Sequence, residues 1–449
     1  MKVLKFGGTS VQFHNNMRQV KEILASMQDE QILLVLSACR GATDNLLKLA
    51  EASARDNQEV AQELISSLSS HHLTLLNDLK LSEELHQAAK AEVQNLLDEI
   101  STLSEGISLL KELTPRSNAT MAAFGELLST TIFSYYLKSE GMNVAFFDAR
   151  KIMSLYYNKQ ETVVDFEKTK INLRNEYSSN LYNGNNLQVI QGFIGSDSLG
   201  NTAVLSRGGS DYSAAVFAAA LDVSEIQIWT DVSGIFSSDP RFFPDAISIE
   251  SMTFAEVREL SAFGAKVLHP DTVKPAIDAN IPVRVLNTNE PKAKGTTLRT
   301  TCADKIELDA MAMQKQLFIF NIVLPSDKNK NAEILQKIAE CMLASSAKYY
   351  LISQGISKIS ILTDNISRLS AIFSRNYHCE IKDNIAAICL VGKNLRNCSN
   401  NHLLQNIAET AGRYKLESFE IISDEAIYIV LSELDNVDEL YAELHSLVI

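Results

Sequence analysis

The feature that most constrains the fold of this chain is an alternation of short apolar runs with long helical patterns over residues 1–300. The apolar runs are continuous, as in strands that are buried on both faces of a parallel sheet. This order predicts an α/β fold with a mostly parallel sheet between two helix layers. The expected strands are 2–6, 31–36, 144–148, 187–192, 226–230 and 283–286.

The stretch over residues 44–136 contains few Gly or Pro and is rich in Leu, Glu, Ala and Ser. Its apolar residues recur with a helical period, so it predicts several helices inserted between two strands.

Two similar units follow at the C-terminal end. Residues 317–376 and 385–447 each show the order strand, helix, two strands, helix, without obvious sequence repetition. A duplicated unit of this kind is typical of small α+β ligand-sensing modules. We expect a catalytic domain over 1–296, a connector over 297–308 and two modules over 309–379 and 380–449.

Charge and cysteine content exclude several classes of function. Lys plus Arg total 41 and Asp plus Glu total 55, so the net charge of −14 disfavours binding to nucleic acids and to anionic membranes. The six cysteines form no CxxC pair, which argues against a metal site or a disulfide scaffold and fits a reducing cytoplasm. No apolar run approaches the roughly 20 residues of a spanning helix, and no signal peptide is recognisable.

The first candidate site residues follow the first strand. Lys5, Gly7, Gly8 and Ser10 lie where a strand ends and a helix begins, and backbone amides at such a point bind phosphate. Lys5 adds a positive charge for a transferring phosphoryl group. The alternative is a simple Gly-Gly turn, since the pattern is neither a standard P-loop nor a dinucleotide fingerprint.

A second small-residue loop, 37–43, follows the second strand and is expected at the same edge of the sheet. Ser37 and Thr43 are candidates for hydrogen bonds to a substrate, although each is equally suited to cap a helix. Glu126 lies in an apolar segment and could receive a substrate ammonium group. The alternative for Glu126 is a solvent-facing position on a helix.

The segment Arg207-Gly208-Gly209-Ser210-Asp211 is the most specific local signal. Arg207 can clamp a carboxylate with two hydrogen bonds, the glycines expose amides, and Asp211 can order a cation or Lys5. Ser210 and Asp211 are also ordinary residues for the start of a helix.

Polar residues after a later strand suit a nucleotide. Thr230 and Asp231 fit its sugar and phosphates, and Phe236 fits its base. Arg241 is either part of this site or a solvated residue of a turn. Lys266 could neutralise phosphates, although a lone lysine is usually surface charge.

Taken together, these motifs resemble those of the aspartokinases, in the same order, and are most similar to the monofunctional, lysine-sensitive type. The motifs are 5–11, 37–43, 124–127, 191–195, 207–212, 229–232 and 263–270. The resemblance implies an amino-acid-kinase domain followed by two ACT modules. It implies transfer of the γ-phosphoryl group of MgATP to the β-carboxylate of L-aspartate, the first step towards lysine, threonine and methionine.

The resemblance also implies roles for individual residues, with ATP and Mg²⁺ as cofactors and a homodimer as the assembly. Catalysis would involve Lys5, Arg207 and Asp211. L-Aspartate would be bound by Ser37, Thr43, Glu126, Phe193, Arg207, Gly208, Gly209 and Ser210. ATP would be bound by Lys5, Gly7, Gly8, Ser10, Thr230, Asp231, Phe236, Arg241, Lys266 and Val267.

Some positions depart from the family pattern. Phe236 stands where Tyr is common, and the first regulatory unit lacks the Gly-Phe-Leu that usually starts its helix. We therefore expect lysine inhibition to be weak, altered or absent. The alternatives to an aspartokinase are another amino-acid kinase of the same fold and a catalytically silent amino-acid sensor.

Overall fold

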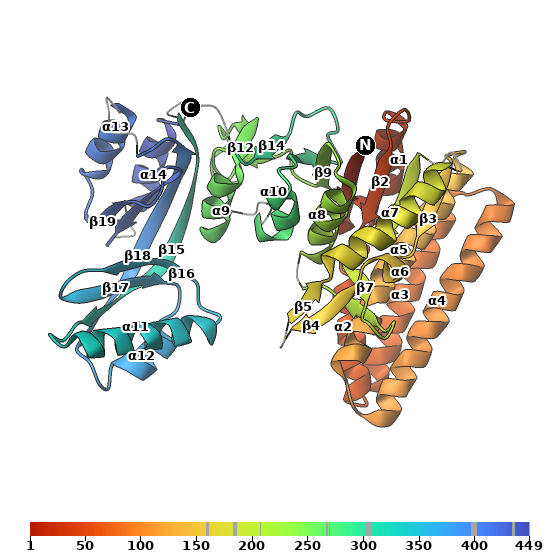
Figure 1. Cartoon of the computed structure of the whole chain (residues 1–449), viewed down its shortest axis with the longest axis horizontal. Helices are drawn as coiled ribbons and strands as arrows, with labels where there is room; N and C mark the ends of the chain where they lie inside the picture. Colours follow the sequence, from red (N-terminus) through yellow and green to blue (C-terminus); the bar gives the residue numbers. More distant parts are fainter. Residues whose placement is uncertain are drawn as a thin grey trace. The chain divides into compact units, whose positions relative to one another are not determined.

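The computed structural model describes residues 1–158, 161–182, 186–206, 208–265, 268, 270–301, 307–396, 402–432 and 436–448 (Figure 1). The chain forms two compact units. The first comprises Met1–Ile235 and His269–Thr300, and the second comprises Phe236–Leu268 and Thr301–Ile449.

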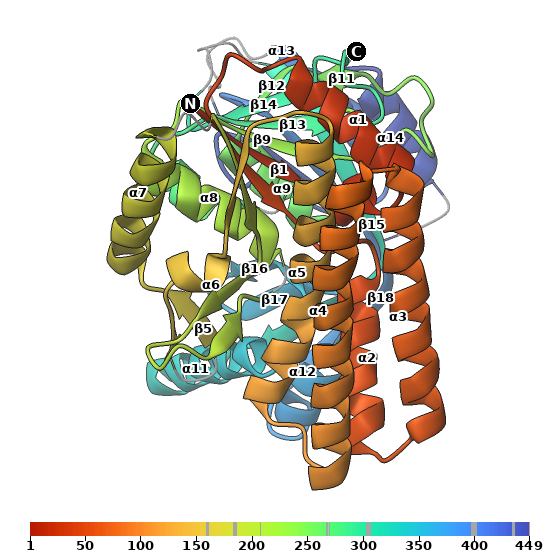
Figure 2. The ribbon, with the colours of Figure 1, turned by 90° about the vertical axis from the view of Figure 1, so that its right-hand side faces the viewer.

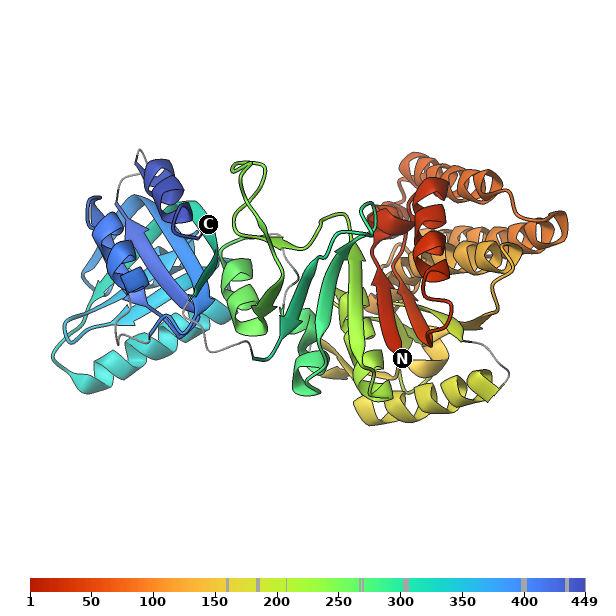
Figure 3. The ribbon, with the colours of Figure 1, turned by 90° about the horizontal axis from the view of Figure 1, so that it is seen from above.

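In the first unit, β14-β13-β9-β1-β2-β6-β3 are consecutive strands of an eight-stranded sheet, and these neighbours are parallel except β13 and β14, which are antiparallel. The red strands of residues 1–36 lie beside the green strands that follow much later in the chain (Figure 3). The predicted strands are confirmed to within one residue at each end. Their bounds are β1 (Lys2–Phe6), β2 (Ile32–Leu36), β3 (Val144–Phe147), β6 (Leu187–Gln191), β9 (Glu225–Thr230) and β13 (Val283–Asn287), and the sheet also contains β14 (Thr296–Arg299), which was not predicted.

Four long helices occupy the stretch for which several helices were predicted: α2 (Ala42–Ala54), α3 (Gln58–Leu79), α4 (Glu83–Leu110) and α5 (Pro115–Ser139). They pack side by side (Figure 2). α5 contacts β2, β3 and β6, and this contact explains why it is buried over most of its length. Its start is defined by the Thr114 side chain, which accepts a hydrogen bond from the Ser117 amide, and by a proline at the first helical position.

α8 (Gly209–Leu221) contacts β1, β2 and β9, so it brings its first turn to the loops that follow those strands. The many alanines of α8 give the helix short side chains, and most residues of the helix are buried. The remaining elements of this unit are η1 (Gly8–Val11), α1 (His14–Ala25), α6 (Ala149–Ile152), β4 (Leu155–Asn158), β5 (Glu161–Val164), α7 (Phe166–Tyr182), β7 (Ile194–Ser196), β8 (Thr202–Val204), η2 (Pro270–Val273) and α10 (Lys274–Asp278).

The second unit contains an antiparallel sheet in the order β16-β17-β15-β18-β20-β19. The predicted order of strand, helix, two strands and helix occurs twice in this unit. The first copy is β15 (Glu307–Val323), α11 (Lys328–Leu343), β16 (Tyr349–Gln354), β17 (Lys358–Thr363) and α12 (Ser367–Phe373). The second is β18 (Cys379–Lys393), α13 (His402–Ala411), β19 (Leu416–Ile421), β20 (Ala426–Leu431) and α14 (Val437–His445).

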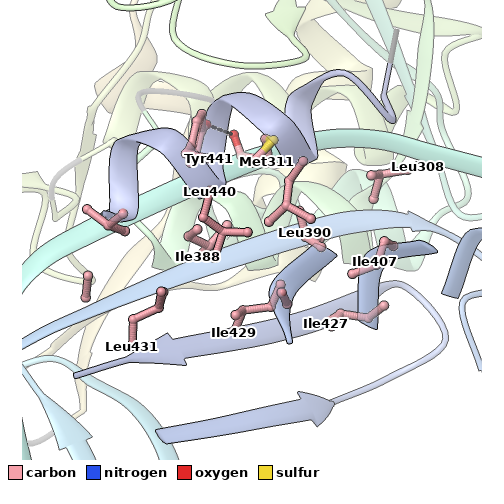
Figure 4. Packing of buried hydrophobic residues seen from close by; sticks show 14 of the residues in the cluster. Leu308, Met311, Ile388, Leu390, Ile407, Ile427, Ile429, Leu431, Leu440 and Tyr441 are labelled. Atoms are coloured by element: carbon pink, nitrogen blue, oxygen red, sulfur yellow. Dashed lines mark hydrogen bonds between the residues drawn. The ribbon is translucent and has the colours of Figure 1, made fainter. Parts of the chain in front are cut away.

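Each copy has its own apolar core, because each βαββ order buries one face of its strands under its helices. In the second copy, Ile388, Ile429 and Leu440 belong to this core, and the Tyr441 hydroxyl donates a hydrogen bond to the Met311 carbonyl at 2.9 Å (Figure 4). The core of the first copy includes Phe320, Ile334, Ile338, Ile361 and Phe373.

Residues 236–268 belong to the second unit, although they lie far from it in sequence. The Phe243 ring packs on Tyr441, with ring centroids 4.8 Å apart, and the Ser237 hydroxyl hydrogen-bonds to His445. This segment contains β11 (Ser248–Ile249), β12 (Ser251–Thr253) and α9 (Phe254–Ala262), while β10 (Ile235–Phe236) spans the junction. The domain boundaries expected near residues 296 and 308 stay a prediction.

Within the described ranges, none of the helices combines the length and the apolar character needed to cross a membrane.

Candidate active site

An ion pair marks the carboxyl end of β1. The Lys5 ammonium lies 2.7 Å from a carboxylate oxygen of Asp211, which is in the first turn of α8. Only 12% of the Lys5 side chain and 19% of the Asp211 side chain are exposed. The structure therefore brings together two residues that are far apart in the sequence. The ion pair holds the lysine side chain in one orientation.

Gly7 and Gly8 have different reasons to lack a side chain. A β-carbon at Gly8 would lie 2.7 Å from the Ala38 carbonyl oxygen, so the backbone requires glycine there. A β-carbon at Gly7 would lie 3.6 Å from the Lys5 Nζ, which is an ordinary contact distance. Gly7 adopts an extended backbone that any residue accepts. Glycine at position 7 therefore leaves the Lys5 ammonium uncovered.

Ser10, predicted to contact the nucleotide, is buried. Its hydroxyl hydrogen-bonds to the Thr288 hydroxyl at 2.7 Å. Thr288 follows β13, and sequence reasoning overlooked it, although its position just after a predicted strand was a usable signal. The contact gives Ser10 a clear part in joining two loops, while its contact with a nucleotide stays a prediction.

The loop between β2 and α2 packs against the first loop. The Arg40 amide donates to the Gly8 carbonyl at 3.2 Å, and the Ser37 carbonyl accepts from the Ser129 hydroxyl. Thr43 lies in the first turn of α2, and its hydroxyl is 3.5 Å from the position of a β-carbon at Gly125. The expectation that these loops share one edge of the sheet is confirmed.

Glu126 is only 3% exposed, so the alternative of a solvent-facing glutamate is wrong. One carboxyl oxygen accepts a hydrogen bond from the Ala38 amide at 3.3 Å, and the other has no hydrogen-bond partner among the described residues. Burial raises the pKa of Glu126 to about 8, while the Ala38 amide and the positive charge of Lys5 act in the opposite direction. The site thus contains a buried carboxyl group with unused hydrogen-bonding capacity.

The start of α8 depends on two close contacts. Gly208 caps the helix with φ +76°, and a β-carbon there would lie 2.5 Å from the Thr272 side chain. A β-carbon at Gly209 would lie 2.6 Å from the Phe193 ring. Both glycines are therefore required by the fold, whatever they bind.

Phe193 and Ser210 lie in the same corner. Phe193 has a left-handed backbone, φ +65°, and its amide donates to the Ser213 hydroxyl at 2.9 Å. Ser210 lies against Gly192, where a β-carbon would approach its side chain to 2.7 Å. A strained residue held by a helix side chain is common at ligand sites. Arg207 lies outside the described residues, so its role stays a prediction.

The residues predicted to bind the nucleotide fall into three groups. Thr230 and Asp231 follow β9, which pairs with β1, and the Thr230 hydroxyl donates to the Asp231 carboxylate at 3.1 Å. Phe236 and Arg241 belong to the second unit, where the exposed Arg241 guanidinium pairs with Asp239. Lys266 and Val267 lie outside the described residues.

The geometry suits two ligand groups side by side, a phosphate near Lys5 and an ammonium group near Glu126. A fixed lysine and backbone amides at the carboxyl ends of parallel strands attract phosphate, and a buried carboxyl group attracts a cation. Such a site can hold a phosphate donor next to an amino acid.

The model of the amino acid kinase family matches residues 1–287. The bifunctional aspartokinase/homoserine dehydrogenase of Buchnera aphidicola is 30% identical over 99% of this chain, which spans only 56% of that relative. Lysine-sensitive aspartokinase 3 of Escherichia coli is 30% identical, with 88% of this chain and 87% of the relative covered.

Solved structures agree with the sequence relatives. Aspartokinase III of E. coli, in complex with lysine and aspartate in the T-state, superposes with a TM-score of 0.82 at 27% identity over 99% of both chains. The same enzyme in complex with aspartate and ADP, in the R-state, gives a TM-score of 0.78 over the same share of each chain. The parallel α/β domain and the antiparallel sheet after it both have counterparts in that fold.

Proposed function

The chain belongs to the amino acid kinase family, and within it to the aspartokinases, and we propose that it transfers the γ-phosphoryl group of ATP to the β-carboxylate of L-aspartate. The products would be ADP and 4-phospho-L-aspartate. The observation that carries the proposal is the Lys5–Asp211 ion pair at the carboxyl end of β1, in the same loop cluster as the buried Glu126.

The reaction needs no nucleophile from the protein. An oxygen of the β-carboxylate attacks the γ-phosphorus, the bond to the bridging oxygen breaks, and that electron pair leaves with ADP. Lys5 offsets the negative charge that is shared among attacking, transferring and leaving oxygens. Asp211 holds the Lys5 ammonium in place, and Gly7 leaves it open to the phosphoryl group.

Glu126 would receive the α-ammonium group of aspartate. Its free oxygen offers a hydrogen-bond acceptor, and the incoming positive charge favours the ionised carboxylate despite burial. Thr43 is near Gly125 and would add a hydroxyl contact, and Arg207 would clamp a carboxylate of the substrate. Ser37, Phe193, Gly208, Gly209 and Ser210 complete the proposed aspartate site.

The phosphate donor would enter as MgATP. The E. coli relative was solved with ADP and aspartate, which supports a nucleotide in this family. Gly7 and Gly8 amides would face the phosphates, and Thr230 and Asp231 would meet the sugar and phosphates. Ser10, Phe236, Arg241, Lys266 and Val267 complete the proposed nucleotide site.

The second unit would regulate the kinase by binding an amino acid. A relative is lysine-sensitive, and its structure contains lysine. We propose that this chain responds to lysine weakly or differently, since its first βαββα copy departs from the family pattern. A homodimer is also proposed, because β16 and β19 are edge strands that could pair with another chain.

The test is to incubate the chain with MgATP and either L-aspartate or L-glutamate, and to trap product with hydroxylamine. An acyl phosphate yields a hydroxamate, whereas a phosphate ester does not. We expect ATP-dependent hydroxamate with aspartate and little with glutamate. A preference for glutamate would indicate another amino-acid kinase, and no hydroxamate with either substrate would indicate a silent sensor.

A further inference from the structure

We propose that Cys39, His71 and His72 form a binding site for a thiophilic divalent cation such as Zn²⁺, separate from the proposed nucleotide and aspartate sites. The Cys39 sulfur and a ring nitrogen of each histidine all lie within 4.8 Å of one another. Thiolate and imidazole are the ligands that Zn²⁺ prefers. The cluster is not visible as a sequence motif, because the cysteine comes from the loop after β2 and both histidines come from α3.

His72 is already oriented as a metal ligand. It is fully buried, and its Nδ1 lies 2.8 Å from the Leu68 carbonyl oxygen. A carbonyl can only accept, so Nδ1 carries the proton and the lone pair is on Nε2. That Nε2 has no hydrogen-bond partner among the described residues. Metal-binding histidines typically donate their other N–H to a carbonyl in this way.

His71 supplies the second nitrogen. Its Nε2 also lacks a hydrogen-bond partner in the described part of the chain, and its ring meets His72 edge-on with centroids 5.1 Å apart. Phe13 covers another edge of the His71 ring at 6.1 Å. His71 is only partly buried, so of the three residues it lies nearest the surface.

Cys39 supplies the sulfur. It is 1% exposed, and its thiol donates to the Val11 carbonyl at 3.1 Å. A cation would replace the thiol proton, which leaves as H⁺ when the metal–sulfur bond forms.

The alternative is a packed histidine pair that binds nothing. Against that alternative, two buried ring nitrogens without hydrogen-bond partners in the described structure are unfavourable, and a bound cation would satisfy both. Ligand atoms around tetrahedral Zn²⁺ lie about 3.5 Å apart, so the cluster must close by roughly 1 Å.

The position of Cys39 links this cluster to the kinase loops. Its neighbour Ala38 donates to Glu126, and its other neighbour Arg40 donates to the Gly8 carbonyl. A cation that draws in Cys39 would shift both amides. Given the proposed kinase function, we expect occupancy to raise the KM for aspartate. Cation binding itself does not depend on that function.

The test uses Co²⁺ as a spectroscopic probe on the full-length protein. We expect one Co²⁺ per chain, with a thiolate charge-transfer band and visible bands of a tetrahedral site. Both should be lost in Cys39→Ser and in His72→Asn, and Zn²⁺ should displace them. Cys389→Ser is the matched control, because Cys389 is an equally buried free cysteine of the second unit.

His71→Asn changes a partly exposed position, so it tests the site even if the buried variants fail to fold. We expect it to weaken Zn²⁺ at least tenfold in competition with a chromophoric chelator. Absent charge-transfer bands, or bands unchanged in Cys39→Ser, would overturn the proposal. If the hydroxylamine test fails while the Co²⁺ bands appear, the cation site stands without the kinase.

Discussion

Two buried glutamates, one in each unit, have similar electrostatics but different surroundings. Glu126 is 3% exposed and Glu256 is 0% exposed, and burial raises the pKa of both. Glu126 uses one oxygen to accept from the Ala38 amide and leaves the other without a partner among the described residues. It therefore has capacity for a ligand.

Glu256 has an acidic neighbour instead. One carboxyl oxygen forms a capping box with Thr253 at the start of α9, and the other has no hydrogen-bond partner within the described ranges. The Asp309 carboxyl beside Glu256 raises its pKa further, whereas Lys5 lowers that of Glu126. Asp309 in turn pairs with Lys393. The comparison teaches that a raised carboxyl pKa and a free oxygen mark burial, and that the neighbouring groups, Lys5 for Glu126 and Asp309 for Glu256, distinguish a candidate binding site from a structural one.

The largest effect should come from Lys5→Met, which removes the charge at the proposed site of transfer. We expect kcat to fall by roughly 10²- to 10³-fold, as for loss of one preorganised electrostatic group. Steady-state kinetics with saturating MgATP and aspartate measure it. Lys2→Met is the matched control, since Lys2 is on the same strand but pairs with Glu30. Equal losses in both variants would contradict the assignment.

The next effect sharpens the comparison of the two glutamates. Glu126→Gln keeps an acceptor for the Ala38 amide but removes the charge for the substrate ammonium. We expect the KM for aspartate to rise about 10- to 100-fold, because a charge-assisted hydrogen bond contributes about 1.5–3 kcal/mol. Glu256→Gln should leave KM unchanged. A similar rise in both would mean that burial, and not the position beside Lys5, determines the effect.

The same residue predicts a dependence on pH. With its pKa near 8, Glu126 of the free enzyme is mostly protonated at pH 7 and ionises as the pH rises. Aspartate binding requires the ionised form, so the KM for aspartate should fall by up to about tenfold per unit from about pH 6 to about pH 8. The Glu126→Gln profile should be flat over that range. An equally steep profile in this variant would assign the titration to another group.

Folding stability should fall as the pH rises, while the affinity for aspartate increases. A carboxyl whose pKa is higher in the folded chain than in the unfolded chain stabilises the fold below its unfolded pKa. That stabilisation is lost as the pH rises through the folded value. The melting temperature of the wild type should therefore fall from about pH 5 to about pH 8, and less so in Glu126→Gln and Glu256→Gln.

The smallest effects are expected for alanine substitutions of the two adjacent glycines, Gly7 and Gly8, and the two variants should differ. Gly8→Ala should lower the free energy of unfolding by roughly 1–3 kcal/mol, because its methyl group meets the Ala38 carbonyl at 2.7 Å. Gly7→Ala should leave stability within about 0.5 kcal/mol of the wild type, yet lower kcat by roughly tenfold by crowding Lys5. Denaturant unfolding and kinetics on both variants measure this. A destabilised Gly7→Ala with normal kcat would contradict it.

Much of the first unit could be predicted from the sequence. Continuous apolar runs defined its strands, and parallel strands bring their carboxyl ends to one edge, so Lys5 and the loop 37–43 were expected together. Burial of Glu126 could not be predicted, because periodicity does not identify which face of α5 is covered when both faces are apolar.

Long-range grouping was the other limit. The segment of Phe236 and Arg241 packs within the second unit through Phe243 and Ser237, a grouping that the motif did not indicate. The place of both residues beside a nucleotide stays a prediction. Local pattern does not reveal contacts across 200 residues of chain. The strand β15 was also longer than expected, since it begins at Glu307 where the apolar pattern is weak.

The two copies in the second unit share a long strand pairing, because β15 and β18 pair from Glu307 opposite Lys393 to Ile322 opposite Cys379, with register shifts along the way. Neither copy can be expressed alone without losing the pairing between β15 and β18. A fragment that starts at residue 380 would expose a long naked strand edge and should aggregate or fail to fold. The second unit should therefore unfold in one cooperative transition, and a ligand bound to one copy would also stabilise the other copy.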